Sequence, residues 1–135
     1  MKSTELMIGD WVSYGGTPIK VENVHGDCMN FQHDIPFVQE EFMIEITKVK
    51  PIPLTIEILE KNGFEQAGDS TFSVSDDGML LNATWWRESL FYVGFYRRDN
   101  NLPNEHFFLN VCYVHELQHI LRLCGQNELA DKFKF

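Results

Sequence analysis

The sequence predicts an α+β protein in which an N-terminal SH3-like small β-barrel region is followed by an antiparallel sheet flanked by two helices. Three observations carry this prediction: closely spaced turn signals in the first fifty residues, β-prone stretches that recur after Phe64, and a helical period near the C-terminus. The chain has 135 residues, of which 44% are hydrophobic, so it is long enough to bury a substantial core. This composition excludes wholesale disorder.

Residues 1–50 are expected to form the SH3-like region, because short β-prone runs alternate there with glycine turns. Ile19 and Val21 alternate with polar neighbours, which is the period of a strand with one solvated face. The turns that separate the runs are Gly9-Asp10, Gly15-Gly16 and Gly26-Asp27. Three short strands joined by hairpins follow, and strands this short favour a small barrel.

Residues 51–135 are expected to form the α+β region. Pro51-Ile52-Pro53 reads as a rigid connector without regular ladder pairing, and Thr55 can cap a helix near 56–62 that Gly63 ends. The β-prone stretches 71–74, 79–83, 90–97 and 106–111 predict an antiparallel meander. Residues 113–124 then switch to a helical period, with an apolar stripe that includes Leu117 and Leu121. The two regions should share one core, because a barrel of about fifty residues buries too little surface alone.

The charge balance argues against nucleic acid and anionic membranes as partners. Eleven basic and twenty acidic side chains give a net charge of −9, so a broad cationic surface is missing. No stretch offers about eighteen uncharged apolar residues, and residues 1–8 lack the apolar core of a signal peptide. Cys28, Cys112 and Cys124 form neither a Cys-x-x-Cys pair nor an even disulfide framework. A cytoplasmic protein without a membrane-spanning segment is therefore expected.

One five-residue motif, residues 115–119, matches the zinc-hydrolase pattern His-Glu-x-x-His. In that pattern His115 and His119 would bind zinc, and Glu116 would act as general base on a metal-bound water. The neighbouring residues argue against it. Arg122 would place a fixed cation beside the metal, and no third ligand follows at the required spacing.

The favoured interpretation of residues 115–119 is a solvated helix face with no metal, no cofactor and no catalytic residue. The helical period puts His115, Gln118, His119 and Arg122 on one polar face, away from the apolar stripe. The remaining candidate ligands, whose spacing does not predict convergence, are His106, Glu128 and Asp131. His25 and His33 are expected at the surface, and Glu40, Glu41 and Glu45 in a solvated loop.

The candidate binding residues are the aromatic side chains Trp85, Trp86, Tyr92 and Tyr96. Together with nearby arginines they could stack on bases, sugars or a peptide. Aromatic residues occupy both alternate sets of the 90–96 strand, so one set must face away from a single core. Packing in a sheet core is the favoured interpretation, and a binding surface is the alternative.

Three blocks of sequence, by their order and spacing, carry a resemblance to a known family. The blocks are Glu5-Leu6 with Ile8-Gly9-Asp10 and Val12, then residues 51–55 with Ile58-Leu59 and Gly63-Phe64, and Tyr113-Val114-His115 with Leu117-Gln118. In these blocks the chain resembles a family of small uncharacterised proteins of Bacteroidetes that often occur in prophages and other mobile elements. Family members often carry Gln in place of Glu116 and Asn in place of His119, so the resemblance implies that the zinc motif is incidental.

These observations predict a non-catalytic intracellular protein-interaction module of mobile-element type, with an unknown protein partner. A zinc-dependent hydrolase that uses His115, Glu116 and His119 is the alternative from another class. A weak nucleic-acid binder acting through the N-terminal barrel is a third. The pattern of residues predicts neither the partner nor the oligomeric state.

Overall fold

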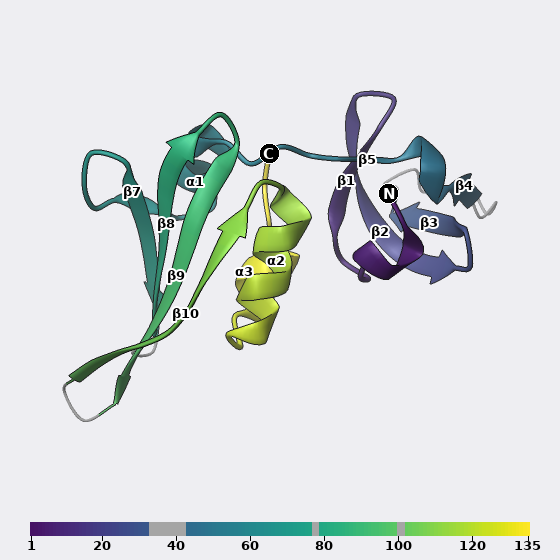
Figure 1. Ribbon diagram of the computed structural model, residues 1–135. Helices are drawn as coiled ribbons and strands as arrows, with labels where there is room; N and C mark the ends of the chain where they lie inside the picture. The colour runs from purple at the N-terminus through teal and green to yellow at the C-terminus, as the bar shows by residue number, and fades with distance from the viewer. Residues whose placement is uncertain (33–42, 77–78, 100–101) are drawn as a thin grey trace. The chain divides into compact units, whose positions relative to one another are not determined.

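The computed structural model describes residues 1–32, 43–76, 79–99 and 102–135 (Figure 1). These residues form a mostly β protein with two five-stranded antiparallel sheets and a C-terminal helix. They divide into two compact units. The first unit is Met1–Ile52 with Val114–Phe133, and the second unit is Pro53–Tyr113 with Lys134–Phe135. The chain thus leaves the first unit after Ile52 and returns to it at Val114.

The sheet of the first unit has the strand order β4-β3-β2-β1-β5. The three predicted hairpin strands are confirmed as β1, β2 and β3. Across the described residues this sheet does not close into a barrel. The elements are η1 (Ser3–Glu5), β1 (Trp11–Tyr14), β2 (Thr17–His25), β3 (Cys28–Gln32), β4 (Met43–Glu45), η2 (Ile46–Lys48) and β5 (Lys50–Pro51).

The predicted alternation along β2 explains how this sheet packs. Ile19 and Val21 are buried, and Val12 on β1 pairs directly with Ile19. One face of the sheet therefore carries the apolar residues that form the core of the unit. The buried members of that core are Leu6, Val12, Ile19, Val21, Met29, Ile44, Ile46 and Val49.

The Pro51-Ile52-Pro53 segment was expected to lack ladder pairing, and this expectation is wrong in part. Lys50 and Pro51 form β5, which pairs with Ser13 and Val12 of β1. Pro53 forms an isolated bridge with Tyr113 in the second unit. A proline lacks the N–H donor but is tolerated in an edge strand, and β5 is the edge of its sheet.

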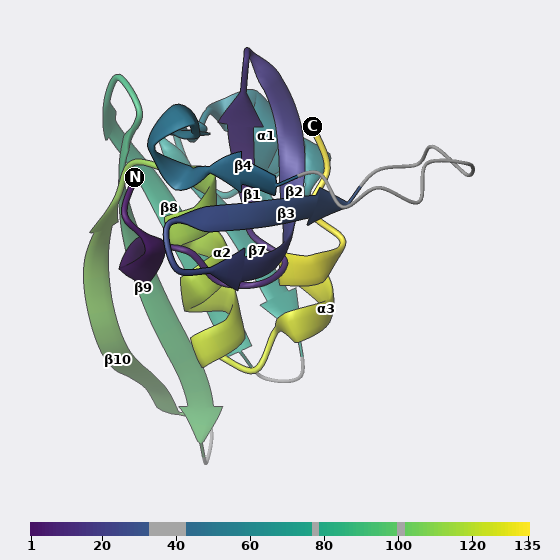
Figure 2. The same cartoon turned by 90° about the vertical axis from the view of Figure 1, so that its right-hand side faces the viewer.

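Two helices complete the first unit: α2 (Val114–Leu123) and α3 (Asn127–Asp131). They pack against each other, and α2 also packs against β1 (Figure 2). The predicted helix near 113–124 is confirmed, and Gly125 at φ 78° ends it. However, this helix belongs to the unit of residues 1–52, so the chain divides differently from the expected 1–50 and 51–135. That the two units share one core stays a prediction.

The second unit contains the predicted meander, with the strand order β10-β9-β8-β7-β6. Thr55 caps α1 as expected: its Oγ1 accepts a hydrogen bond from the Ile58 amide at 3.2 Å. Gly63 follows the helix at φ 85°. The elements are α1 (Ile56–Lys61), β6 (Glu65–Gln66), β7 (Thr71–Asp76), β8 (Met79–Arg87), β9 (Leu90–Asp99) and β10 (Leu102–Val111).

Alternate residues of the meander are buried, as a sheet with one core-facing side requires. Leu81 and Ala83 on β8 and Phe91 and Val93 on β9 are all 0% exposed, whereas Tyr92 between the last two is 44% exposed. The prediction that one aromatic set of this strand faces away from the core is therefore confirmed. No helix in the described part of the chain combines the length and apolarity needed to cross a membrane.

Gly94 in β9 provides the space for an aromatic ring. It pairs with Phe108 of β10, and the Phe108 ring stacks on Tyr92 with centroids 4.9 Å apart and planes 8° apart. The same ring meets Tyr96 edge-on at 5.9 Å. A Cβ at position 94 would lie only 2.5 Å from Phe108 Cε1 and 3.2 Å from Tyr96 Cε2.

Gly94→Ala should therefore destabilise the second unit by about 1 to 3 kcal/mol, the usual cost of overpacking. The Phe108 ring must move to admit the methyl group, and doing so disrupts its stack on Tyr92. Urea unfolding followed by tryptophan fluorescence measures the effect. Gly68→Ala is the matched control, because its Cβ would meet nothing closer than 3.8 Å. Equal stability of the two variants would contradict the packing described for Phe108.

Candidate functional site: a buried polar network on helix α2

Asp10 is a fully buried carboxylate at the start of β1. It closes a turn with Met7, since the Asp10 amide donates to the Met7 carbonyl at 3.1 Å and the Met7 amide donates to Asp10 Oδ2 at 2.7 Å. Gly9 adopts φ 92° inside this turn, a backbone conformation that favours glycine. The Asp10 side chain is 0% exposed, so its charge needs partners within the protein.

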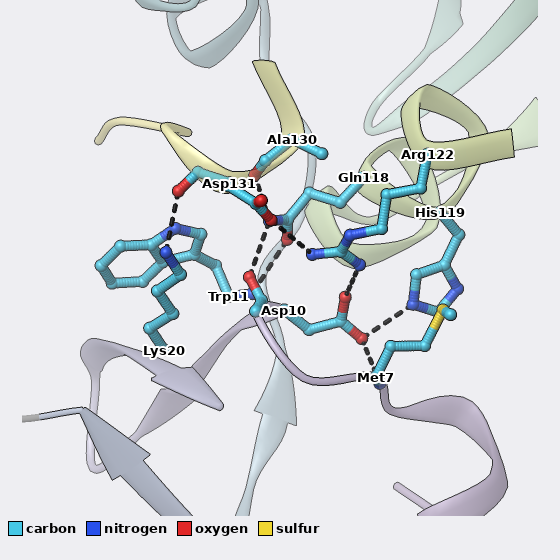
Figure 3. A network of polar contacts seen from close by, with 10 residues as sticks. Met7, Asp10, Trp11, Lys20, Gln118, His119, Arg122, Ala130 and Asp131 are labelled. Atoms are coloured by element: carbon cyan, nitrogen blue, oxygen red, sulfur yellow. Dashed lines mark hydrogen bonds and ion pairs between the residues drawn. The ribbon is translucent and has the colours of Figure 1, made fainter. Parts of the chain in front are cut away.

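Helix α2 supplies those partners (Figure 3). His119 Nε2 lies 2.7 Å from Asp10 Oδ2, and Arg122 Nη1 donates to Asp10 Oδ1 at 2.7 Å. The two side chains are three residues apart and so lie on one side of the helix. Arg122 Nη2 also lies 3.8 Å from Asp131 Oδ1 of α3. The buried carboxylate is thus paired with a guanidinium and an imidazole in short, charge-assisted contacts.

Gln118, which is also 0% exposed, joins three segments of the first unit. Its Oε1 accepts a hydrogen bond from the Trp11 amide at 2.9 Å. Its Nε2 donates to the Gly9 carbonyl at 3.0 Å and to the Ala130 carbonyl at 2.9 Å. One side chain therefore fixes the start of β1, helix α2 and helix α3 relative to one another.

The expected solvated helix face is wrong for α2. His115 is 6% exposed and Gln118 is fully buried, and the side chain of His119 is 27% exposed. A helical period separates polar from apolar residues but does not say whether the polar side meets water or an internal partner. The sequence did not predict the burial of Asp10, because Gly9-Asp10 is typical of a turn and an aspartate in a turn usually lies at the surface.

The residues of the His-Glu-x-x-His motif do not fit a catalytic zinc site. His119 Nε2 is engaged by Asp10, and Arg122 sits on the other oxygen of the same carboxylate. The His115 ring meets the His119 ring edge-on, with centroids 5.7 Å apart. Among the side chains that the structure describes, which do not include that of His106, no three His, Cys, Asp or Glu residues cluster so that they could hold a metal ion. A catalytic zinc takes three protein ligands.

Among the described residues, the other candidate ligands form no metal-binding cluster with His115 and His119. Glu128 makes an exposed ion pair with Lys132 at 3.9 Å, and Asp131 is half exposed beside Arg122. His25 is exposed, as expected. His33, Glu40 and Glu41, together with the side chain of His106, lie outside the described residues. Glu116 is half-buried in the first turn of α2.

Burial lowers the pKa of His115 below its ordinary value of 6.5. The nearby carboxylates of Asp10, Glu116 and Glu5 act in the opposite direction, and His119 adds to the lowering. Because the folded state holds this proton less well than the unfolded state, the stabilising contribution of neutral His115 is complete above about pH 6.5. It is lost as the pH falls below that value.

The free energy of unfolding should accordingly drop between pH 7.5 and pH 5.5 more in the native protein than in His115→Gln. Chemical denaturation at the two pH values measures both drops. His25→Gln, which changes an exposed histidine, should retain the full drop. A His115→Gln variant whose drop equals that of the native protein would show that His115 does not carry the pH dependence.

Of the four aromatic candidates, Tyr92 and Tyr96 share one face of the second sheet. Tyr92 stacks on Phe108 and Tyr96 meets the same ring edge-on. One face of the exposed Tyr92 ring is therefore already covered. The contacts of Tyr92 and Tyr96 therefore support a role in sheet packing as much as a role in binding.

Trp85 and Trp86 lie elsewhere, at the end of the β8–β9 hairpin. Trp85 pairs with the buried Phe91, and Trp86 is the extra residue of a bulge before Arg87. Trp85 Nε1 donates to the Glu88 carbonyl at 2.9 Å. Trp85 is 39% exposed and Trp86 69% exposed. The structure thus separates the four predicted residues into a tyrosine pair on the sheet and a tryptophan pair at the hairpin end.

The three cysteines, all within the described part of the chain, form no disulfide. Burial raises the pKa of the Cys124 thiol to about 11. Since the thiolate is the nucleophilic form, Cys124 is poorly suited to nucleophilic chemistry at neutral pH.

Comparison with known proteins adds no relative. No family model matches the chain, and neither a curated protein nor a solved structure matches it. The resemblance to the Bacteroidetes family therefore stays an expectation, and the functional argument rests on the residues and their geometry.

Proposed function

We propose that this protein is a non-catalytic protein-interaction module that binds its partner through the end of the β8–β9 hairpin. One observation carries the proposal: Trp85, Trp86 and Arg87 follow one another there, and all three are exposed. Tryptophan and arginine are, with tyrosine, the residue types enriched among binding hot spots. A large indole exposed on a hairpin gains much apolar burial when a partner covers it.

The local backbone also supports a binding role for this hairpin. Glu88 is the one non-glycine residue with positive φ, at 48°, among the described residues. Such a conformation costs of order 1 kcal/mol or more, and it persists where the surroundings impose it. The hydrogen bond from the Trp85 indole to the Glu88 carbonyl fixes the turn. The neighbouring Trp86 side chain is therefore presented on a constrained backbone, which lowers the entropic cost of binding.

We also propose that the first unit has an SH3-like fold. Three features support this: the strand order β4-β3-β2-β1-β5, the irregular pairing of the long strand β2 between Val21 and Asn23, and the 3-10 turn η2 between β4 and β5. A break in the pairing of a long strand allows a sheet to bend sharply. Because small folds of this kind carry many functions, the proposed activity rests on the tryptophan hairpin and not on the fold.

Site-specific photocross-linking in the organism that encodes the chain tests the function. A benzophenone amino acid at position 86 should give a discrete adduct with one protein, whereas the same group at Glu57, exposed on α1, should not. The purified partner should then bind the native chain, and Trp86→Ala should weaken binding at least tenfold. Glu57→Ala should leave the affinity unchanged. Identical adducts from both positions, no adduct, or unchanged affinity in Trp86→Ala would overturn the proposal.

A further inference from the structure

We propose that the turn Met7–Asp10 and the adjoining side of α2 form a second, preorganised docking surface for a basic amphipathic helix of a partner protein. We call it the Ile8 surface: Met7, Ile8, His119 and Leu123, with Glu5 and Glu116 at its border. This inference rests on the proposed role as an interaction module but involves none of the residues of the tryptophan hairpin.

The Ile8 surface exposes large apolar side chains. Ile8 is 65% exposed, Met7 49% and Leu123 79%. The Met7 amide and His119 Nε2 both contact Asp10 Oδ2, each at 2.7 Å, so the turn lies against this side of α2 (Figure 3). Leu123 lies one helical turn beyond His119 on the same side of the helix. Adjacent exposed apolar residues of this size are typical of interaction sites.

Met7 and Ile8 stand on a turn that the buried network holds by several hydrogen bonds. The Met7 amide shares Asp10 Oδ2 with His119, and Gln118 holds the Gly9 carbonyl. Gly9 also lies against Arg122, since a Cβ there would be 2.8 Å from Arg122 Nη2. The buried network therefore fixes the backbone that displays Met7 and Ile8. Fixing a surface before binding reduces the entropy lost on association.

The charges around the Ile8 surface favour a basic partner helix. The side chains of Arg122 and His119, which adjoin the turn, are both directed at Asp10. The carboxylates of Glu5 and Glu116 act on His115 electrostatically, so both lie near His115, one helical turn before His119. The chain as a whole carries a net charge of −9. An apolar surface bordered by carboxylates complements a helix that has an apolar stripe flanked by lysines.

The probe is an 18-residue peptide of leucine and lysine whose leucines follow the helical period, added to the isotope-labelled full chain. Its binding should shift the amide resonances of Met7, Ile8, His119 and Leu123. Ile8→Ser and Leu123→Ser should each weaken binding at least tenfold. Met43→Ser, which changes a 51% exposed apolar residue of the first unit, is the matched control. Because both test positions are exposed, these variants should keep the native unfolding midpoint.

Three outcomes would overturn the inference: no binding, equal binding of a peptide with glutamate in place of lysine, or shifts spread over acidic residues away from the Ile8 surface. Trp86→Ala should leave peptide binding unchanged. Loss of the Trp86 cross-link with intact peptide binding would reject the hairpin proposal alone. An intact cross-link with no peptide binding would reject the Ile8 surface alone.

Discussion

Replacing Asp10 with Ala should lower the free energy of unfolding of the first unit by about 3 to 5 kcal/mol, the usual cost of breaking a buried ion pair. The substitution removes the acceptor for the Met7 amide, His119 Nε2 and Arg122 Nη1 at once. The Arg122 side chain is 15% exposed, so its charge would stay largely buried without its main partner. Denaturant unfolding followed by circular dichroism measures the change.

Asp27→Ala is the control for Asp10→Ala. Asp27 is an exposed aspartate in the β2–β3 turn, and a surface substitution of this kind should stay within about 0.5 kcal/mol. A loss below 1 kcal/mol for Asp10→Ala would mean that the network contributes little to the fold. Arg122→Ala should resemble Asp10→Ala and should not add to it in the double variant, because the two residues share one interaction.

Gln118→Ala should destabilise the first unit by about 2 to 4 kcal/mol. The Gln118 side chain makes three hydrogen bonds, each of which contributes about 1 kcal/mol. Their loss leaves backbone groups of Gly9, Trp11 and Ala130 without this partner. Gln118→Leu, which keeps most of the volume, should recover little. That comparison separates lost hydrogen bonds from the cavity that alanine leaves.

Gln66→Ala is the matched control, because Gln66 is exposed and its side-chain amide donates to the nearby Gly68 carbonyl. Its unfolding midpoint should equal that of the native chain. Recovery of full stability in Gln118→Leu would contradict the role of Gln118 as a hydrogen-bonding junction and would make α2 an ordinary apolar packing element.

Local signals in the sequence were sufficient for most of the secondary structure. The glycine turns predicted β1, β2 and β3, and the alternation of Ile19 and Val21 predicted the buried face of the sheet. Thr55 and Gly63 predicted the two ends of α1. Each of these features depends on residues a few positions apart. Their outcome is therefore set by backbone conformation and by the period of the side chains.

Contacts between distant residues could not be predicted in the same way. Asp10 and His119 are 109 positions apart, and no local pattern links an aspartate in a turn with the polar side of a C-terminal helix. The same limit explains the misplaced helix. Its apolar stripe was visible in the sequence, but the polar residues Gln118, His119 and Arg122 attach α2 to the first unit.

The aromatic candidates show a different limit. The alternation in the 90–96 strand correctly placed Tyr92 on the side opposite Phe91. It could not reveal that Phe108 covers Gly94 and stacks on Tyr92, because that contact depends on the register between β9 and β10. Nor could it reveal the bulge that carries Trp86. The binding residues that we propose are accordingly the tryptophans at the hairpin end.

His119 contributes to the buried network around Asp10, so we predict that the His-Glu-x-x-His motif holds no catalytic metal, and zinc content tests this central claim most directly. The full chain, purified without added metal, is dialysed and its zinc is measured by mass spectrometry. Because His119 Nε2 is engaged by Asp10 and Arg122 is paired beside it, zinc should remain well below one equivalent per chain. One equivalent of zinc that survives dialysis and is lost in His119→Ala would contradict the claim.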